Sequence, residues 1–287
     1  MQKELQEQLF ENYPLIFRNK DKPQSQSLLY CGLCVENGWY HLIDQLCGFL
    51  QFHHDHNGYP QAIASQVKQK FGVLRFYTKF EDGDRSDRPE SYLLGAVHFA
   101  EHLSARICEL CGAMGAETGL WAVKGYVTTL CLQCRKGQIF EDQPVNSNIL
   151  KPPGGWKKKD RHLYEEYPLI FKDRSRPMTE TCMCWGICTG EGWFDLIDQL
   201  CGWLQSQTDK NAYSQVVAEQ VKEKFGELCF YVRYEGESEK DIEYLEGAID
   251  FAGNFSGRIC EQCGRPGTQT DTGGWIKTLC NECRGKK

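Results

Sequence analysis

The chain has 287 residues, of which 41% are hydrophobic and 25% charged, and its formal net charge is −6. This composition is ordinary for a globular protein, and the length accommodates two units that each bury a core. The acidic balance disfavours wholesale binding to nucleic acid, and the absence of any apolar run near the ~20 residues of a membrane span disfavours a membrane protein.

The chain contains one unit twice. Residues 38–48 and 192–202 are identical at nine of eleven positions, which chance cannot supply. Three shorter blocks match in the same order: Tyr-Pro-Leu-Ile-Phe at 13–17 and 167–171, Lys-Phe-Gly at 70–72 and 224–226, and Arg-Ile-Cys-Glu at 106–109 and 258–261. We therefore expect a first module at 9–137, a Pro- and Gly-containing linker at 138–161, and a second module at 162–287.

In each module the Tyr-Pro-Leu-Ile-Phe block and a Pro-containing loop should precede an amphipathic helix. In the first copy this helix runs from Trp39 to about Gln51, because its apolar residues fall at helical spacing. The next stretch, 63–72, is ambiguous between a helix that ends at its glycine and the first arm of a hairpin that turns there. Residues 74–80 and 228–234 are rich in aromatic and branched residues and predict a strand.

A second helix follows the strand in both copies. Its apolar stripe consists of Leu93, Val97, Ala100, Leu103 and Ile107 in the first copy, and of Leu245, Ile249, Ala252, Phe255 and Ile259 in the second. Both helices of a module thus present one apolar face. The strand is the obvious surface for these faces to cover.

Each module ends in two Cys-x-x-Cys pairs. The cysteines are Cys108, Cys111, Cys131 and Cys134 in the first copy, and Cys260, Cys263, Cys280 and Cys283 in the second. One tight turn aims two sulfurs at one ion, and two such turns complete a tetrahedral zinc site. Iron–sulfur clusters use other spacings, and a redox pair needs only two cysteines. We predict two structural Zn²⁺ ions, because four protein ligands leave no position open for water.

The expected fold class is therefore α+β. Two tandem homologous modules each have helices packed on a small β-sheet or hairpin and end in a four-cysteine zinc ribbon. Since the N-terminus lacks the apolar core of a secretory signal, the sixteen cysteines indicate metal ligands in a reducing compartment, and we expect a cytoplasmic protein.

The remaining cysteines allow two interpretations. Cys182, Cys184, Cys188 and Cys201 could take a further metal, but the first copy offers only Cys31, Cys34 and Cys47 in that region. The alternative is that Cys47 and Cys201, which lie on the apolar stripe of the first helix, are buried thiols.

No repeated constellation supports catalysis. The tract His53-His54-Asp55-His56 looks like a metal site, but the second copy has Ser-Gln-Thr-Asp at 206–209, so a solvated loop is favoured. Phosphate loops, nucleophile elbows and His-Glu-x-x-His helices are missing from the sequence, and no histidine follows His162. We therefore expect no enzymatic activity.

One shared set of side chains is suited to binding. It comprises Lys68, Lys70, Tyr77 and Lys79, matched by Lys222, Lys224, Tyr231 and Arg233. A strand face that mixes tyrosine with cations suits a phosphate-bearing ligand or an acidic patch on a protein. A sheet face that is merely solvated, or covered by a helix, is the alternative.

The repeated motifs resemble a known family. Tyr-Pro-Leu-Ile-Phe, Gly-Trp-Phe-Asp-Leu-Ile-Asp-Gln-Leu-Cys, Gln-Val-Lys-Glu-Lys-Phe-Gly and the closing Gly-Gly-Trp-Ile-Lys-Thr-Leu-Cys are similar to those of small bacteriophage and prophage proteins, mostly of unassigned function. The first copy departs from the pattern at Leu28 and Tyr30, where the second has Cys182 and Cys184. The resemblance implies a mobile-element setting, hence a host cytoplasm, but transfers no active site.

Three functions follow as hypotheses. The first is a non-enzymatic binding protein, a phage counter-defence factor that engages and masks a host or defence protein. The second is a sink that sequesters a nucleotide-type anion on the Lys/Tyr/Arg face. The third, a nucleic-acid-binding zinc ribbon, is weakened by the acidic balance.

Overall fold

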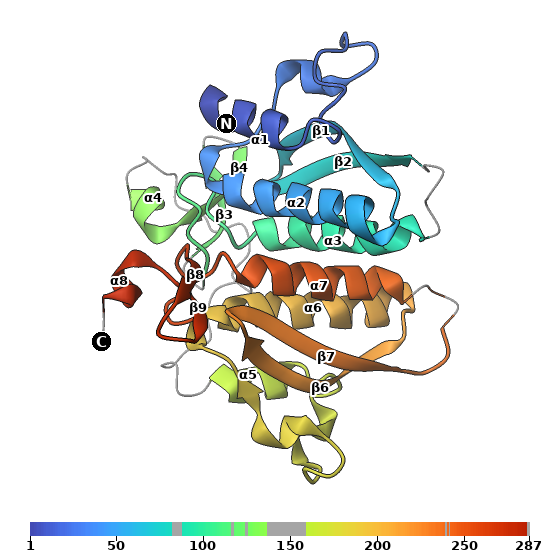
Figure 1. The fold of residues 1–287 in the computed structure, drawn as a ribbon, viewed down its shortest axis with the longest axis vertical. Helices are drawn as coiled ribbons and strands as arrows, with labels where there is room; N and C mark the ends of the chain where they lie inside the picture. Colours follow the sequence, from blue (N-terminus) through green and yellow to red (C-terminus); the bar gives the residue numbers. More distant parts are fainter. Residues whose placement is uncertain are drawn as a thin grey trace. The chain divides into compact units, whose positions relative to one another are not determined.

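The structure, a computed structural model, describes residues 1–81, 88–115, 118–123, 126–136, 159–238, 240 and 242–285. Of these described residues 44% are helical and 26% are in strands, which is the α+β class predicted. The chain divides into two compact units, Met1–Leu150 and Lys151–Lys287, and the same order of elements recurs in both (Figure 1).

The regular elements of unit 1 are α1 (Lys3–Asn12), α2 (Tyr40–Asn57), β1 (Gln61–Lys70), β2 (Val73–Glu81), α3 (Glu90–Ser104), β3 (Thr118–Val123), β4 (Tyr126–Cys131) and α4 (Leu132–Lys136). Those of unit 2 are α5 (Lys159–Glu166), β5 (Ile187–Cys188), α6 (Phe194–Asn211), β6 (Gln215–Lys224), β7 (Glu227–Glu235), α7 (Glu243–Ser256), β8 (Thr268–Asp271), β9 (Ile276–Leu279) and α8 (Asn281–Arg284). Short 3-10 turns precede the long helices at Asn37–Trp39 and Glu191–Trp193.

The ambiguous stretch 63–72 is the first arm of a hairpin. β1 pairs antiparallel with β2, from Gln61 opposite Glu81 to Lys70 opposite Val73, and β6 pairs with β7 in the same way. A helix ending at Gly72 is therefore the wrong alternative. Alternation alone could not exclude it, because the pairing partner that fixes a strand lies beyond the turn.

The helices cover one face of each hairpin. Figure 1 shows α2 and α3 side by side against β1 and β2, and the two apolar stripes predicted from the sequence are buried in both units. Trp39 of the first stripe is fully buried, and so is Trp193 of its counterpart. This face of the hairpin, with Leu74 and Phe76, forms the core of unit 1.

Helix α2 is longer than expected and contains the histidine tract. It ends at Asn57, where Gly58 adopts a left-handed conformation with φ 71° and caps it. The expectation of a solvated loop at residues 53–56 is wrong. Phe49 and Leu50 are buried within the predicted helix, and His53 continues their face past the predicted end by packing against Phe49 and Tyr92.

The edges of the hairpin are covered by hydrogen bonds from neighbouring segments. The amide of Ala64 donates to the Ile16 carbonyl at 2.9 Å, so the Tyr-Pro-Leu-Ile-Phe block lies along β1. On the opposite edge, the amide of Leu74 donates to Oγ of Ser104 in α3 at 2.8 Å. Unit 2 repeats both contacts, through Ile170 and Ser256. In unit 2 the short strand β5 also pairs parallel with β6. Covered edges keep such small sheets from pairing with other chains.

Two short helices begin outside the predicted module bounds. Helix α1 begins at Lys3, ahead of the predicted start at residue 9, and α5 begins at Lys159, inside the predicted linker 138–161. Residues 137–158 lie outside the described part of the chain. These short polar helices carry few apolar residues, and among their described side chains only Leu9 and Leu163 are buried. The apolar pattern that predicts a helix is therefore absent from them.

Candidate metal centres and binding surfaces

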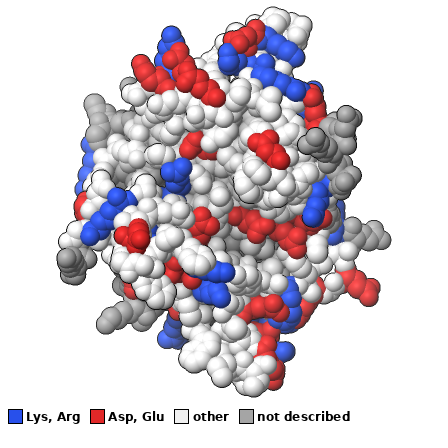
Figure 2. All heavy atoms as spheres, viewed as in Figure 1, with Lys and Arg blue, Asp and Glu red and all other residues white. Residues whose placement is uncertain are grey.

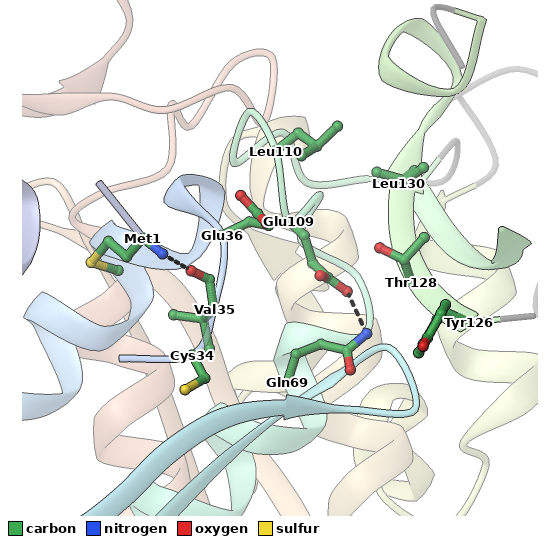
Figure 3. Close-up of a pocket in the computed structure, with 10 residues that line it drawn as sticks. All are labelled: Met1, Cys34, Val35, Glu36, Gln69, Glu109, Leu110, Tyr126, Thr128 and Leu130. Atoms are coloured by element: carbon green, nitrogen blue, oxygen red, sulfur yellow. Dashed lines mark hydrogen bonds between the residues drawn. The ribbon is translucent and has the colours of Figure 1, made fainter. Parts of the chain in front are cut away.

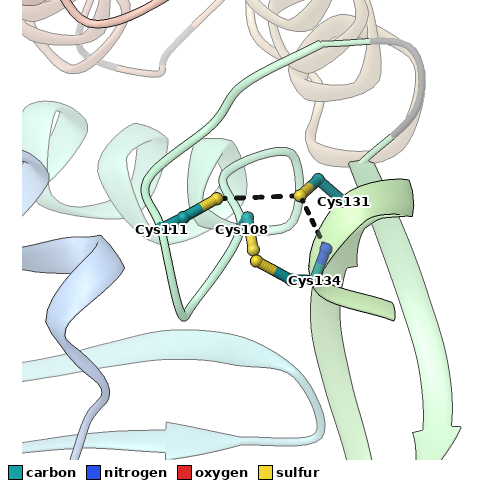
Figure 4. Close-up of side chains that lie close together, drawn as sticks. All are labelled: Cys108, Cys111, Cys131 and Cys134. Atoms are coloured by element: carbon teal, nitrogen blue, oxygen red, sulfur yellow. Dashed lines mark hydrogen bonds between the residues drawn. The ribbon is translucent and has the colours of Figure 1, made fainter. Parts of the chain in front are cut away.

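The four cysteines that end unit 1 lie together. Cys108 and Cys111 come from the turn after α3, Cys131 from the end of β4 and Cys134 from α4 (Figure 4). Their sulfurs all lie within 4.8 Å of one another, and Sγ of Cys111 is 3.6 Å from Sγ of Cys131. Tetrahedral coordination at about 2.3 Å from metal to sulfur places sulfurs about 3.8 Å apart. The cysteines therefore suit a metal ion with little rearrangement.

Unit 2 repeats this cluster with Cys260, Cys263, Cys280 and Cys283, again within 4.8 Å of one another. Burial raises the pKa of Cys263. Hydrogen bonds from the amide and guanidinium of Arg265 and from the neighbouring thiols outweigh this effect and lower the pKa to about 6. Nη2 of Arg265 also donates to Oε2 of Glu282 at 2.6 Å. The thiolate is the metal ligand, so the lowered pKa favours ligation by Cys263, whereas burial raises the pKa of Cys260 and of Cys283.

Each cluster is built against the start of the first long helix. Gly112 and Gly264, after the second cysteine of the pair, have φ values of 72° and 76°, as the knuckle turn predicts. The amide of Gly38 donates to the Glu109 carbonyl at 2.6 Å. A Cβ at Gly38 would lie 2.1 Å from the Cys108 carbonyl oxygen, and one at Gly192 would meet the same obstacle. Glycine is therefore required at both positions, because any side chain would clash with the backbone of the cysteine turn.

The ribbon is also fastened to the hairpin turn. The hydroxyl of Thr129 in β4 donates to the carbonyl of Gly72 at 2.5 Å, and Thr278 in β9 donates to Gly226 at 2.6 Å. Both threonines are fully buried. Helix, hairpin and cysteine cluster are thus joined into one body within each unit.

The remaining cysteines do not form a third cluster. Among the described residues, the groups with metal-binding spacing are the two at the ends of the units. Cys201 is buried in α6, whereas Cys182 and Cys188 are exposed. Burial raises the pKa of Cys47 and of Cys201 well above that of an ordinary thiol, which agrees with the prediction of buried thiols.

The predicted binding residues of unit 1 share the face of the hairpin opposite the helices. Lys68 and Lys70 of β1 and Tyr77 and Lys79 of β2 alternate with the buried residues of their strands. Nζ of Lys68 lies 5.3 Å from the centroid of the Tyr77 ring, and that ring is 41% exposed. In unit 2, Nζ of Lys222 lies 5.4 Å from the centroid of the Tyr231 ring, and Lys224 is exposed at the turn.

Arg233 differs from its counterpart Lys79. Its guanidinium forms ion pairs with Oδ2 of Asp173 at 2.5 Å and with Oε1 of Glu235 at 2.6 Å. Asp173 is itself buried. Arg233 is thus engaged in a contact that holds the fold, whereas Lys79 is exposed.

An exposed phenylalanine stands at the turn of each hairpin. Phe71 and Phe225 have φ values of 55° and 54°, and 73% and 66% of their surfaces are exposed. Nζ of Lys70 lies 5.5 Å from the Phe71 ring, and Lys224 takes the same position over Phe225. Such turns normally use Asn-Gly or Asp-Gly, because a left-handed residue other than glycine or asparagine is strained.

Unit 1 also contains a pocket of about 560 Å³ between β1, β4 and the first knuckle (Figure 3). Its lining residues are Met1, Cys34, Val35, Glu36, Gln69, Glu109, Leu110, Tyr126, Thr128 and Leu130. Glu109 is only 4% exposed. Burial raises the pKa of its carboxyl, which the Thr129 amide and the Thr128 and Gln69 side chains oppose. The sequence showed this glutamate only as part of the repeated Arg-Ile-Cys-Glu block.

No family model, curated protein or solved structure matches this chain. Within the described residues, none of the helices has the length and apolar character needed to cross a membrane.

Proposed function

We propose that each cysteine cluster binds one Zn²⁺ ion that holds the end of its unit together. Four thiolates at tetrahedral spacing are the usual donor set of structural zinc and leave no position for a substrate. Elemental analysis should find two zinc ions per chain. Replacement of zinc by Co²⁺ should give the absorption of tetrahedral thiolate coordination, and its absence would argue against these sites.

We further propose that the protein is a non-enzymatic binding protein that engages an acidic surface on a partner protein. The observation that carries this proposal is the exposed phenylalanine in a left-handed conformation at each hairpin turn. Backbone strain and an exposed aromatic ring both work against stability, so their repetition at Phe71 and Phe225 favours a role outside the fold. The lysines over these rings supply positive charge for the partner.

Other repeated residues form hydrogen bonds within the unit, which leaves the hairpin turn as the repeated feature suited to binding a partner. The hydroxyl of Tyr13 donates to Asp44 at 2.9 Å, and Nε1 of Trp39 donates to the Ile107 carbonyl at 2.8 Å. Asp44 thereby has a structural role. The resemblance to phage and prophage proteins then supports a counter-defence factor that masks a host or defence protein in the host cytoplasm.

Replacement of the turn residues tests this proposal without disturbing the fold. Phe71→Asn and Phe225→Asn remove both rings and place at the turn a residue that accepts the left-handed conformation. We expect the double variant to keep its zinc and its stability while it loses the partners that the parent protein captures from host lysate. Phe52→Ser, which removes a 54% exposed ring from α2, is the matched control and should capture the same partners. Capture that survives the double variant would refute the hairpin surface.

The two alternative functions predict different measurements. An anion sink should give heat with cyclic or linear nucleotides in calorimetry, lost in Lys79→Ala and Arg233→Ala; the ion pairs of Arg233 weigh against it. A nucleic-acid-binding ribbon should show a salt-dependent gel shift. On the face drawn in Figure 2, Lys and Arg are interspersed with Asp and Glu, which does not favour such a surface.

A further inference from the structure

The pocket of unit 1 has a buried carboxylate in its wall. Oε1 of Glu109 accepts a hydrogen bond from the Thr129 amide at 2.9 Å and lies 3.5 Å from Nε2 of Gln69 (Figure 3). In the part of the chain that the structure describes, no Lys or Arg forms an ion pair with it. A second carboxylate, that of Glu36, also lines the pocket.

Unit 2 shows what the equivalent carboxylate accepts. Glu261 occupies the position of Glu109. Its Oε1 atom accepts a hydrogen bond from Nζ of Lys277 at 2.7 Å. Lys277 stands in β9 three residues before Cys280, where β4 of unit 1 has Thr128 three residues before Cys131. The two units therefore share the carboxylate and differ in the cation. Unit 2 provides its own ammonium, and unit 1 has a short neutral side chain at that position.

We propose that the pocket of unit 1 binds the side chain of a lysine or arginine presented by a partner protein, with its cationic head on Glu109 where unit 2 holds Lys277. A buried carboxylate forms strong, charge-assisted hydrogen bonds with an ammonium or guanidinium group.

The remaining walls suit the rest of such a side chain. Leu110, Leu130 and Tyr126 supply apolar surface for an aliphatic stem, and Tyr126 is 79% exposed and can contact the partner's backbone. The ammonium of Met1 is the positive charge among the lining residues, and it donates to the Val35 carbonyl. A volume of about 560 Å³ accommodates a whole side chain with its flanking backbone.

All the residues that line this pocket belong to unit 1, and the pocket does not depend on the proposed hairpin surface. Loss of partner capture in the Phe71→Asn and Phe225→Asn variant tests that surface and leaves the pocket unchanged. The two proposals can therefore fail separately.

Amide chemical-shift titrations of the zinc-loaded full chain test the pocket. The probe is acetyl-Gly-Lys-Gly-amide, and its comparison is the same peptide with an Nε-acetylated, uncharged lysine. We expect saturable shifts at Tyr126, Thr128 and Leu130 with the charged peptide, and affinity at least about tenfold weaker for the neutral one, because a hydrogen bond to a charged group is lost.

Exchange of the two unit-specific residues provides the matched variants. Thr128→Lys should place the unit 2 ammonium on Glu109 and abolish peptide binding, whereas Thr128→Ser, which keeps the hydroxyl beside Glu109, should retain it. Lys277→Thr should create a second site, with new shifts around Glu261. Zinc content and an unchanged spectrum of unit 2 verify that the Thr128 variants are folded.

Three results would overturn the proposal. They are equal shifts with the charged and neutral peptides, peptide binding that persists in Thr128→Lys, and no saturable shift in the parent protein. Butylammonium that binds as tightly as the peptide would assign the pocket to small free amines and reject a protein side chain.

Discussion

Nε1 of Trp39 donates a hydrogen bond to the carbonyl of Ile107 at 2.8 Å, across 68 residues of sequence. Trp193 and Ile259 form the same bond in unit 2. Each bond ties the 3-10 turn that precedes the long helix to the residue directly before the first cysteine of the cluster. The most nearly identical block of the repeat thus serves to orient the metal site.

The variant Trp39→Phe tests this relationship. It keeps an aromatic ring but leaves the buried Ile107 carbonyl without its donor, which should destabilise unit 1 by about 1–3 kcal/mol. Amide hydrogen exchange measures this change, and unit 2 serves as the reference within the same molecule. Trp185→Phe, at a 67% exposed indole, should leave exchange unchanged.

Loss of one ligand should release one metal ion only. Cys111→Ser is expected to lower the zinc content from two ions per chain to one and to unfold the ribbon of unit 1, since zinc binding contributes on the order of 10–16 kcal/mol in isolated zinc peptides. Elemental analysis and limited proteolysis measure both effects. Cys34→Ser also replaces an exposed cysteine and should keep both ions. A Cys111→Ser protein with full zinc content would contradict the assigned ligands.

The contact between ribbon and hairpin turn should depend on a hydroxyl. Thr129→Val preserves the shape of the side chain but removes the donor to the buried Gly72 carbonyl, at an expected cost of about 1–3 kcal/mol. Thr129→Ser retains the donor and should cost less. Chemical denaturation of the zinc-loaded protein compares the two, and equal losses would show that packing, not the hydrogen bond, fastens the ribbon.

Unit 1 should lose stability as the pH falls below about 6.5 because of His53. Burial lowers the pKa of this histidine to about 4, and Nδ1 of the imidazole lies 2.9 Å from Nδ2 of Asn57. The unfolded chain takes up the proton at a higher pH than the folded one, so the stability present above pH 6.5 is lost progressively towards pH 4.

His53→Gln, which introduces the residue found at the equivalent position 207, should remove this dependence. At pH 5 the parent protein should have lost about 1–2 kcal/mol more than the variant, after allowance for the partial exposure of the ring. Denaturation curves at pH 7 and pH 5 give the comparison. Parallel losses in the two proteins would exclude His53 as the origin.

Some elements could be predicted because their signal is local. Four cysteines in two Cys-x-x-Cys pairs predict that their sulfurs cluster, and the stripe from Leu93 to Leu103 predicts a helix with one buried face. Ile107, the last residue of the predicted stripe, is buried but lies beyond the end of α3 at Ser104. Gly112 likewise follows from the knuckle turn alone. Duplication strengthened each signal, since a pattern present in both copies is required by the unit.

The sequence by itself determined the repeat, the two long helices of each unit and the eight cysteines that cluster in two groups of four, because spacing along the chain sets these features. Tertiary structure alone decided that residues 63–72 form a strand, that Arg233 is engaged by Asp173, and that Glu109 lines a pocket while Glu261 holds Lys277. These outcomes depend on partners that lie far along the chain. No local pattern of residue types fixes which carboxylate meets which cation, because the folded backbone alone brings them within hydrogen-bond distance.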